Sequence, residues 1–244
     1  MHPTVDLNCD LGEGADHDAE LMPLITSANI ACGAHAGNLE TMTEAIECAA
    51  EHGVSVGAHP GYFDLENFGR VERAISPPEA SRLVLMQMEQ CYEIAGAAMK
   101  HVKLHGALYN QVSRDAALAD AVVADLGRLW PDVTVFALAG SVLARVAKSR
   151  GLKVAEEVFA DRTYASDGSL TPRSSPGATI DDVALAEAQV LRMVREGVVQ
   201  STDGREVRVK ADTICVHGDG PKAVEFARRL RRALTKARIA IRSF

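Results

Sequence analysis

The sequence lacks the features that would assign it to several large classes of protein. No apolar run approaches the roughly 20 residues that a membrane-spanning helix requires, so we expect no membrane partner. Lys and Arg number 26 against 33 Asp and Glu, for a net charge of −7, and this balance argues against a nucleic-acid partner. The chain also opens on a strand-like pattern, without the basic and apolar regions of a secretory leader.

The chain contains few cysteines, and their number is odd. Of the five cysteines, Cys9, Cys32 and Cys215 lie in apolar runs, whereas Cys48 and Cys91 lie in helical patterns. This distribution is typical of small buried side chains in a reducing compartment, and not of disulfides or a zinc cage. We therefore expect a cytoplasmic location.

Two common nucleotide-binding signatures are missing as well. Neither the phosphate-loop pattern G-x-x-x-x-G-K-[ST] nor the dinucleotide pattern G-x-G-x-x-G occurs. The segment Gly218-Asp-Gly-Pro-Lys222 resembles a phosphate loop in composition only. We therefore do not expect the chain to bind ATP or NAD by itself.

What the chain does contain is a regular alternation of short apolar runs with patterns of helical period. Because no linker-like stretch interrupts this alternation, we expect one domain over residues 1–244. An Asp-Gly turn at 203–204 predicts a β-hairpin between 198–200 and 207–209. The patterns predict strands at 5–9, 29–33, 54–58, 102–105, 133–138, 153–159 and 213–217, and helices at 38–52, 76–98, 113–129, 141–150, 179–196 and from 221.

Histidines recur at equivalent places in this alternation. Four histidines each follow or end a predicted strand, and each is followed by a glycine one or two residues later in the sequence: His35, His59, His105 and His217. Parallel strands that alternate with helices bring the polar residues at their C-terminal ends into one site. We therefore expect an enzyme with its site at the strand ends, although any single one of these histidines could be a structural residue.

The predicted strands also divide into an apolar and a polar face, because successive side chains of a strand point to opposite sides. Asp6, Asn8 and Asp10 share one face of the first strand, and Lys103 and His105 share one face of the fourth. Helices around a barrel would cover the apolar faces and leave the polar faces inside, where they must bond to one another, to a metal or to a substrate. The pattern predicts an α/β fold, an irregular seven-stranded β/α barrel of the TIM-like type.

Simpler roles for these polar residues remain open. The carboxylates and amide of the first strand could form local Asx turns. Lys103 could form a simple salt bridge with Asp6 or Asp10, and Arg162 could form a surface ion pair instead of gripping a substrate carboxylate. A divalent metal that activates water and a metal-free acid–base site are both compatible with the strand-end histidines and carboxylates.

Several long motifs resemble those of the LamB/YcsF family, and the resemblance spans essentially the whole chain. Two departures, Ala34 in place of a frequent Phe and Leu104 in place of a frequent Pro, remove no polar group. The motifs are Asp6-Leu-Asn-Cys-Asp-Leu-Gly-Glu-Gly14, Asn29-Ile-Ala-Cys-Gly-Ala-His-Ala-Gly37, Gly57-Ala-His-Pro-Gly-Tyr62, Phe68-Gly-Arg70, Val102-Lys-Leu-His-Gly-Ala-Leu-Tyr-Asn110, Glu157-Val-Phe-Ala-Asp-Arg162 and Cys215-Val-His-Gly-Asp219.

The resemblance implies a barrel of the glycoside hydrolase/deacetylase type and a place as the A subunit of a bacterial ATP-dependent 5-oxoprolinase. Its implied reaction is the hydrolysis of the lactam 5-oxo-L-proline to L-glutamate, coupled to ATP through partner subunits B and C. The alternatives are a metal-dependent carbohydrate or amide deacetylase on the same barrel, and a binding subunit without activity of its own.

For such a reaction, residues are needed that activate water, stabilise an oxyanion and protonate the leaving nitrogen. We expect Asp10 with His59 or His105 to activate water, and His217 with Asp219 to act as the acid. We expect Lys103 to offset negative charge. The candidate catalytic residues are thus Asp10, His59, Lys103, His105, His217 and Asp219; the candidate substrate-binding residues are Asp6, Asn8, Glu13, His35 and Arg162; the candidate metal ligands are Asp10, His35 and His59.

Overall fold

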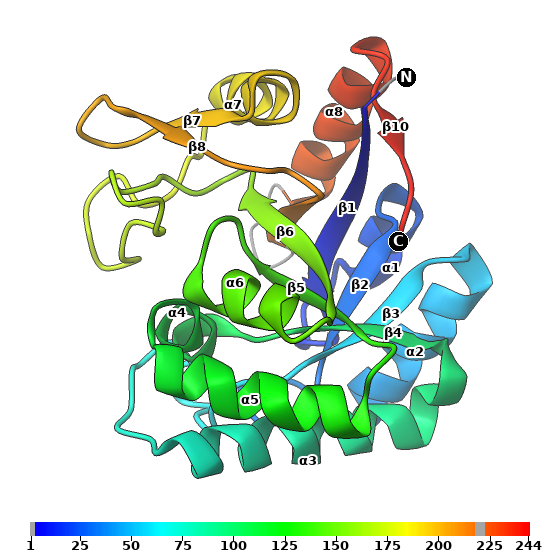
Figure 1. Cartoon of the computed structure of the whole chain (residues 1–244). Helices are drawn as coiled ribbons and strands as arrows, with labels where there is room; N and C mark the ends of the chain where they lie inside the picture. The colour runs from blue at the N-terminus through cyan, green and yellow to red at the C-terminus, as the bar shows by residue number, and fades with distance from the viewer. Residues whose placement is uncertain (1–2, 218–222) are drawn as a thin grey trace.

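The strands form a closed ring. The computed structural model describes residues 3–217 and 223–244. Seven parallel strands pair in the order β1-β2-β3-β4-β5-β6-β9, and β9 pairs in turn with β1 (Figure 1). The α/β fold, an irregular seven-stranded β/α barrel, is therefore confirmed. Its strands are β1 (Thr4–Leu11), β2 (Ser27–Ala31), β3 (Ser55–His59), β4 (Met99–Lys103), β5 (Thr134–Leu138), β6 (Lys153–Phe159) and β9 (Thr213–His217).

Helices follow most of the strands and surround the ring. In Figure 1, α3 and α5 lie together along one side of the barrel, and they pack against each other. Of the helices that the structure describes, none has the length and apolar character needed to cross a membrane. The helices are α1 (Asp18–Leu21), α2 (Leu39–His52), α3 (Pro77–Ala95), α4 (Gly106–Arg114), α5 (Ala116–Leu129), α6 (Val142–Ser149), α7 (Val183–Glu196) and α8 (Ala223–Lys236), with 3-10 turns η1 (Met22–Leu24) and η2 (Gly96–Ala98).

Side-chain caps mark two of the helix starts that the sequence predicted. The Asn38 side chain accepts a hydrogen bond from the Thr41 N–H at the start of α2, and Ser141 does the same for Ala144 in α6. The helix expected at 113–129 is confirmed as α5, except that it begins at Ala116 because Asp115, and not Ser113, caps it. The preceding helix α4 was not predicted.

Smaller differences from the sequence prediction have local causes. β2 ends before Gly33, whose positive φ of 77° is incompatible with a strand. β4 ends at Lys103 because His105 already precedes the first turn of α4. The predicted hairpin is confirmed as β7 (Val198–Gln200) and β8 (Glu206–Arg208), whereas the short β10 (Ala240–Ile241), which pairs with β1, was not predicted.

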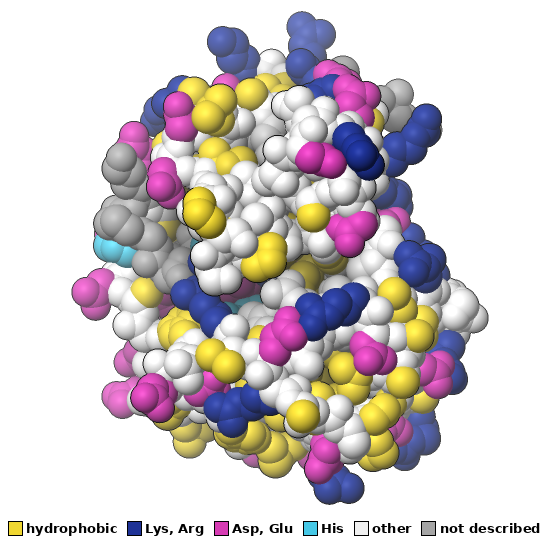
Figure 2. All heavy atoms as spheres, turned by 90° about the vertical axis from the view of Figure 1, so that its left-hand side faces the viewer, with side chains coloured by type: hydrophobic (Ala, Val, Ile, Leu, Met, Phe, Trp, Pro, Cys, Tyr) yellow, Lys and Arg dark blue, Asp and Glu magenta, His cyan; other side chains and the backbone are white. Residues whose placement is uncertain are grey.

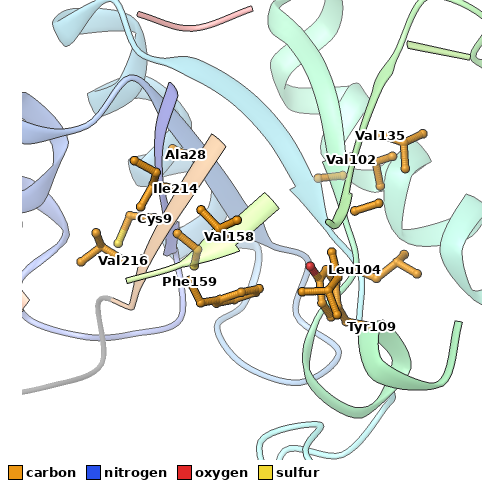
Figure 3. Packing of buried hydrophobic residues seen from close by; sticks show 14 of the residues in the cluster. Cys9, Ala28, Val102, Leu104, Tyr109, Val135, Val158, Phe159, Ile214 and Val216 are labelled. Carbon is orange, nitrogen blue, oxygen red and sulfur yellow. The ribbon is translucent and has the colours of Figure 1, made fainter. Parts of the chain in front are cut away.

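The apolar faces of the strands form the contact with the helices. Leu7 and Cys9 of β1 are fully buried in the hydrophobic core. Figure 3 shows Val102 next to Val135, which are register partners on β4 and β5. The polar faces therefore point into the barrel, as the division of the strand faces predicts.

Two rings stack in the interior at the middle of β4 and β5. The His101 imidazole stacks on Phe136 with 4.2 Å between ring centroids, and its Nε2 donates to Asn29 Oδ1 at 2.9 Å. Gly57 makes room for this stack, since a Cβ atom at that position would lie 2.2 Å from the His101 ring.

Burial of His101 makes the stability of the fold depend on pH. Desolvation is the largest cause that lowers the pKa of His101, to about 3, so the ring is neutral in the native state. The unfolded ring takes up a proton below its ordinary pKa of about 6.5. The contribution of the neutral His101 ring to the free energy of unfolding is therefore complete above about pH 6.5 and is lost as the pH falls towards 3.

We expect the free energy of unfolding to fall by about 2 kcal/mol when the pH is lowered from 6.5 to 5, because protonation of the unfolded His101 contributes about 1.4 kcal/mol per pH unit. Urea unfolding of the wild type and of His101→Gln at both pH values measures it. Exposed His52 provides the control, as His52→Gln. The same pH dependence in His101→Gln as in the wild type would contradict the prediction. If that variant does not fold, an NMR titration that shows a charged native His101 at pH 5 would do so.

Candidate functional site

A cavity of about 300 Å³ opens at the C-terminal ends of the strands. Figure 2 shows this face of the molecule, with a hollow in which histidine and acidic side chains are visible and Lys and Arg side chains on either side. Its floor comes from the strand ends, and its walls come from the β3–α3 loop, α4 and the long loop after β6. The predicted site residues that line it are Asp10, Glu13, His59, Lys103, His105, Arg162 and His217.

A buried ion-pair cluster forms the floor. Lys103 Nζ lies 2.7 Å from Asp10 Oδ1 and 2.9 Å from Glu157 Oε1, and it also contacts Asn8 Oδ1 at 3.2 Å and Cys215 Sγ at 3.0 Å. Burial alone would raise the pKa of Asp10, but the positive charges of His59 and Lys103 hold it well below its ordinary value. Burial would likewise lower the pKa of Lys103, and its anionic neighbours keep it well above the ordinary value. Both groups are therefore charged at neutral pH.

Glu157 and its partner Tyr109 complete this cluster, and sequence reasoning missed both as site residues. Glu157 is fully buried, and its Oε2 accepts a hydrogen bond from the Tyr109 hydroxyl at 2.8 Å. The signal was present in the sequence, because Glu157 shares the inward face of β6 with Phe159, two residues further along. A carboxylate on that face needs a buried cation, and Lys103 provides it.

Two histidines meet next to Asp10. His59 Nδ1 lies 2.8 Å from the carbonyl oxygen of Lys103, and His105 Nε2 lies 2.9 Å from that of Phe68. A carbonyl oxygen only accepts, so both nitrogens must carry a proton. The remaining nitrogens, His59 Nε2 and His105 Nδ1, face each other at 2.9 Å. Two lone pairs repel at this distance, and the contact therefore requires a proton or another cation between the rings.

The surroundings supply negative charge to this contact. Asp10 Oδ2 lies 3.3 Å from His59 Nε2, and Glu13 Oε1 lies 3.5 Å from His105 Nδ1. Phe68, whose φ of 55° is strained for a residue with a side chain, directs its carbonyl to His105. Strain of this kind is concentrated at functional sites, and here it holds an imidazole in one orientation.

His35 packs against the His59–His105 pair and does not line the cavity. Its ring stacks on His105 with a centroid distance of 3.7 Å, and its Nε2 lies 3.2 Å from Glu13 Oε1. Burial is the largest cause that lowers the pKa of His35. Gly61 allows the close packing, since a Cβ atom there would lie 2.8 Å from His35 Nδ1.

His217 stands on another strand at the same mouth. Its Nδ1 lies 2.7 Å from Asp161 Oδ2, and the positive charge of His217 outweighs burial and lowers the pKa of Asp161. We expected Asp219 to support this histidine. Asp219 lies outside the described residues, and Asp161, which sequence reasoning did not assign, occupies the supporting position.

Arg162 lines the cavity, but most of its hydrogen-bonding capacity is directed at the backbone. Its Nε donates to the carbonyl of Ala178 at 3.2 Å and its Nη2 to that of Thr171 at 2.6 Å. The side chain is only 4% exposed. Direct binding of a substrate carboxylate by Arg162 therefore stays a prediction, and the observed contacts are those of a residue that holds a loop.

The structure does not bring Asp6 and Asn8 to the cavity. Both are 0% exposed. Asp6 accepts hydrogen bonds from the hydroxyls of Thr26, Ser27 and Thr213. Asn8 donates to Glu157 and Thr213 and lies below Lys103. We expected both to bind substrate; their hydrogen bonds instead satisfy polar groups within the barrel.

Among the residues that the structure describes, two groups of side chains could hold a metal ion. The first consists of Glu13, His35, His59 and His105, and the second of Asp10, Cys215 and His217. The expected ligand set of Asp10, His35 and His59 is thus divided between them. The first group fits a metal better. The inner nitrogens of His59 and His105 face each other, and an ion would take the place of the proton between them. Each outer N–H donates to a backbone carbonyl, as in metal-bound histidines.

Comparisons with known proteins find relatives that match the whole chain. A relative from Bordetella pertussis (strain Tohama I), named as the A subunit of 5-oxoprolinase, is 49% identical over 251 residues, which cover 100% of both chains. The same name and identity apply to a relative from Bordetella parapertussis. The crystal structure of the lactam utilization protein from Thermus thermophilus matches with a TM-score of 0.90 and 43% identity over 99% of this chain and 100% of that chain.

More distant structures share the fold alone. A family 4 carbohydrate esterase from Streptomyces lividans matches with a TM-score of 0.50 and 10% identity, over 98% of this chain and 91% of that chain. The chain therefore shares its barrel fold with that esterase. The model of the LamB/YcsF family matches residues 5–244. The chain belongs to the LamB/YcsF family.

Proposed function

We propose that this chain is the A subunit of an ATP-dependent 5-oxoprolinase and that its cavity holds the lactam of 5-oxo-L-proline during hydrolysis to L-glutamate. The names of the full-length relatives support a 5-oxoprolinase subunit. The observation that carries the proposal is the cluster in which Asp10 contacts both Lys103 and His59 at the floor of a small cavity. A carboxylate, an imidazole and a fixed cation are the groups that hydrolysis of an amide bond needs.

The residues have distinct roles in this proposal. Asp10 and the His59–His105 pair orient a water molecule and take its proton as the water oxygen attacks the lactam carbonyl carbon. Lys103 offsets the negative charge that develops on the carbonyl oxygen. When the carbon–nitrogen bond breaks, His217, oriented by Asp161, gives a proton to the leaving nitrogen.

ATP enters the proposal through partner subunits. Opening a five-membered lactam needs coupling, and the sequence carries neither nucleotide-binding signature. The word "subunit" in the names of the relatives supports a complex, for which we propose partners of the B and C type. We also propose a cytoplasmic location, which the free thiols of all five cysteines support.

We expect the purified chain to release little glutamate from 5-oxo-L-proline and ATP, and the chain with its B and C partners to release it steadily. Chromatographic measurement of glutamate, with and without each partner, tests this. Full ATP-dependent turnover by the chain alone would contradict the role of the partners. Absence of turnover in the complete mixture would contradict the proposed function.

The geometry of the histidines favours one second candidate, a metal-dependent amide or carbohydrate deacetylase. A divalent ion held by His59, His105 and Glu13 would supply a Lewis acid for activation of water. Metal analysis of the purified chain distinguishes the candidates when combined with an assay of acetate release. One metal ion per chain together with acetate release without ATP would favour the deacetylase.

A further inference from the structure

The loop after β6 carries a positive charge to the mouth of the cavity. Residues 161–178 connect β6 towards α7, and Leu170, Pro172, Arg173 and Ser174 of this loop line the cavity. Arg173 is exposed and makes no hydrogen bond or ion pair with the residues that the structure describes. An arginine that faces a cavity without such a partner can bind an anion with two parallel hydrogen bonds.

Arg162 fixes the part of the loop that bears Arg173. Its two hydrogen bonds go to the carbonyls of Thr171 and Ala178, which stand at the two ends of segment 172–177. Thr163 adds two contacts, from its N–H to Ala178 and from its hydroxyl to the carbonyl of Gly177. The segment is therefore tied at both ends to the residues that follow β6, and the position of Arg173 depends on the buried guanidinium of Arg162.

The other charges of the cavity are already engaged. Lys103 is paired with Asp10 and Glu157, and Glu72 is paired with Arg114 at 2.6 Å. The guanidinium of Arg70 stacks over the ring of Phe68, with its Cζ 4.6 Å from the ring centroid, on the wall formed by the β3–α3 loop. Arg173 therefore has no hydrogen-bonded partner among the described residues. Its charge lowers the pKa of the nearby Asp161, and it lowers the pKa of Arg162 in addition to the larger effect of burial.

We infer that Arg173 binds the carboxylate of a small anionic amide substrate, and that Arg162 is a positioning residue that holds the loop for this contact. This inference rests on the proposed function, in which the substrate 5-oxo-L-proline carries one carboxylate next to its lactam. The lactam then points to Asp10 and His59 on the floor, and the carboxylate points to the loop. The site therefore selects acidic lactams over neutral ones.

Binding to the isolated chain tests the inference without turnover. Isothermal titration calorimetry compares 5-oxo-L-proline with 2-pyrrolidinone, the same lactam without the carboxylate. We expect the wild type to prefer the acid, and Arg173→Gln to lose about 10- to 100-fold of its affinity for the acid only, as for a lost hydrogen bond to a charged group. Arg208→Gln, which changes an exposed arginine of β8, is the matched control and should bind like the wild type.

The variants separate the two arginines. Arg162→Ala should lose affinity for 5-oxo-L-proline but keep its affinity for 2-pyrrolidinone, whereas general unfolding would weaken both. If Arg173→Gln keeps the wild-type preference for 5-oxo-L-proline over 2-pyrrolidinone, the inference is wrong, and Arg162 is again the residue expected to bind the carboxylate. Equal binding of the two lactams by the wild type, or binding of neither, would also overturn it.

Turnover by the complete complex distinguishes this inference from the proposed function. If the complex hydrolyses 5-oxo-L-proline, Arg173→Gln should raise KM with little change in kcat. If the complex shows no turnover while the isolated chain selects the acid through Arg173, the proposed function fails and the inference stands. If turnover occurs with an unchanged KM in Arg173→Gln, the inference fails and the function stands.

Discussion

Replacement of Asp10 by Asn should lower kcat for glutamate formation by about 100- to 10,000-fold, the usual effect of losing a general acid–base group. The amide keeps the shape of the carboxylate but cannot take a proton from water or balance His59. We expect the same range for His105→Ala, which removes the second imidazole of the pair. Steady-state assays of the complete complex measure both effects.

The fold of these variants needs an independent check, because both residues are buried. Circular dichroism and urea unfolding establish whether each variant is native under assay conditions. Asp125→Asn is a matched control, since Asp125 pairs with Ser81 and Arg128 on the helical surface, outside the cavity. A kcat close to that of the wild type in both Asp10→Asn and His105→Ala would show that the strand-end cluster is structural, and the mechanism would have to be abandoned.

Replacement of Lys103 by Met should destabilise the protein by about 3–5 kcal/mol, because it leaves buried carboxylates without their cation. Lys103 is 2% exposed and lies within 3 Å of both Asp10 and Glu157. The free energy of unfolding in urea at neutral pH gives the size of the effect. It should exceed the effect of any single exposed ion pair in this chain.

A second substitution makes this prediction specific. Lys103→Met combined with Glu157→Gln should recover part of the lost stability, since one of the two unpaired charges is removed. Lys148→Met breaks a half-exposed pair with Glu156 and should cost about 1 kcal/mol or less. Equal losses for Lys103→Met and Lys148→Met would contradict a central role for the buried cluster.

Most of the barrel could be predicted from the sequence because its strands alternate in a simple way. Polar residues at every second position of β1 and β4 indicated an interior of hydrogen bonds, and the structure confirms one around Lys103. The short helix α4 was missed, because it begins directly after the end of β4 without a side-chain cap. The two-residue β10 is too short to leave a pattern.

The candidate site was predictable as a set of residue types but not as a set of partners. The two-residue period of a strand predicts that Asp6, Asn8 and Asp10 share one face. It does not predict how deep in the barrel each side chain lies, and of the three only Asp10 reaches the cavity. The partnership of His217 with Asp161 joins residues 56 positions apart. Such pairings depend on how the ring closes, which no local pattern contains.

Closure of the ring also has a consequence for synthesis of the chain. The first strand pairs with β9, and the Asp6 carboxylate accepts its hydrogen bond from Thr213, 207 residues later. During translation, the Asp6 carboxylate therefore lacks this hydrogen bond until β9 has been synthesised, although Thr26 and Ser27 are available to it much earlier. A chain that stops before β9 would keep unpaired interior charges and an open sheet edge, which mark it for aggregation or proteolysis. Closure of the barrel therefore requires the strand that is synthesised last among the seven.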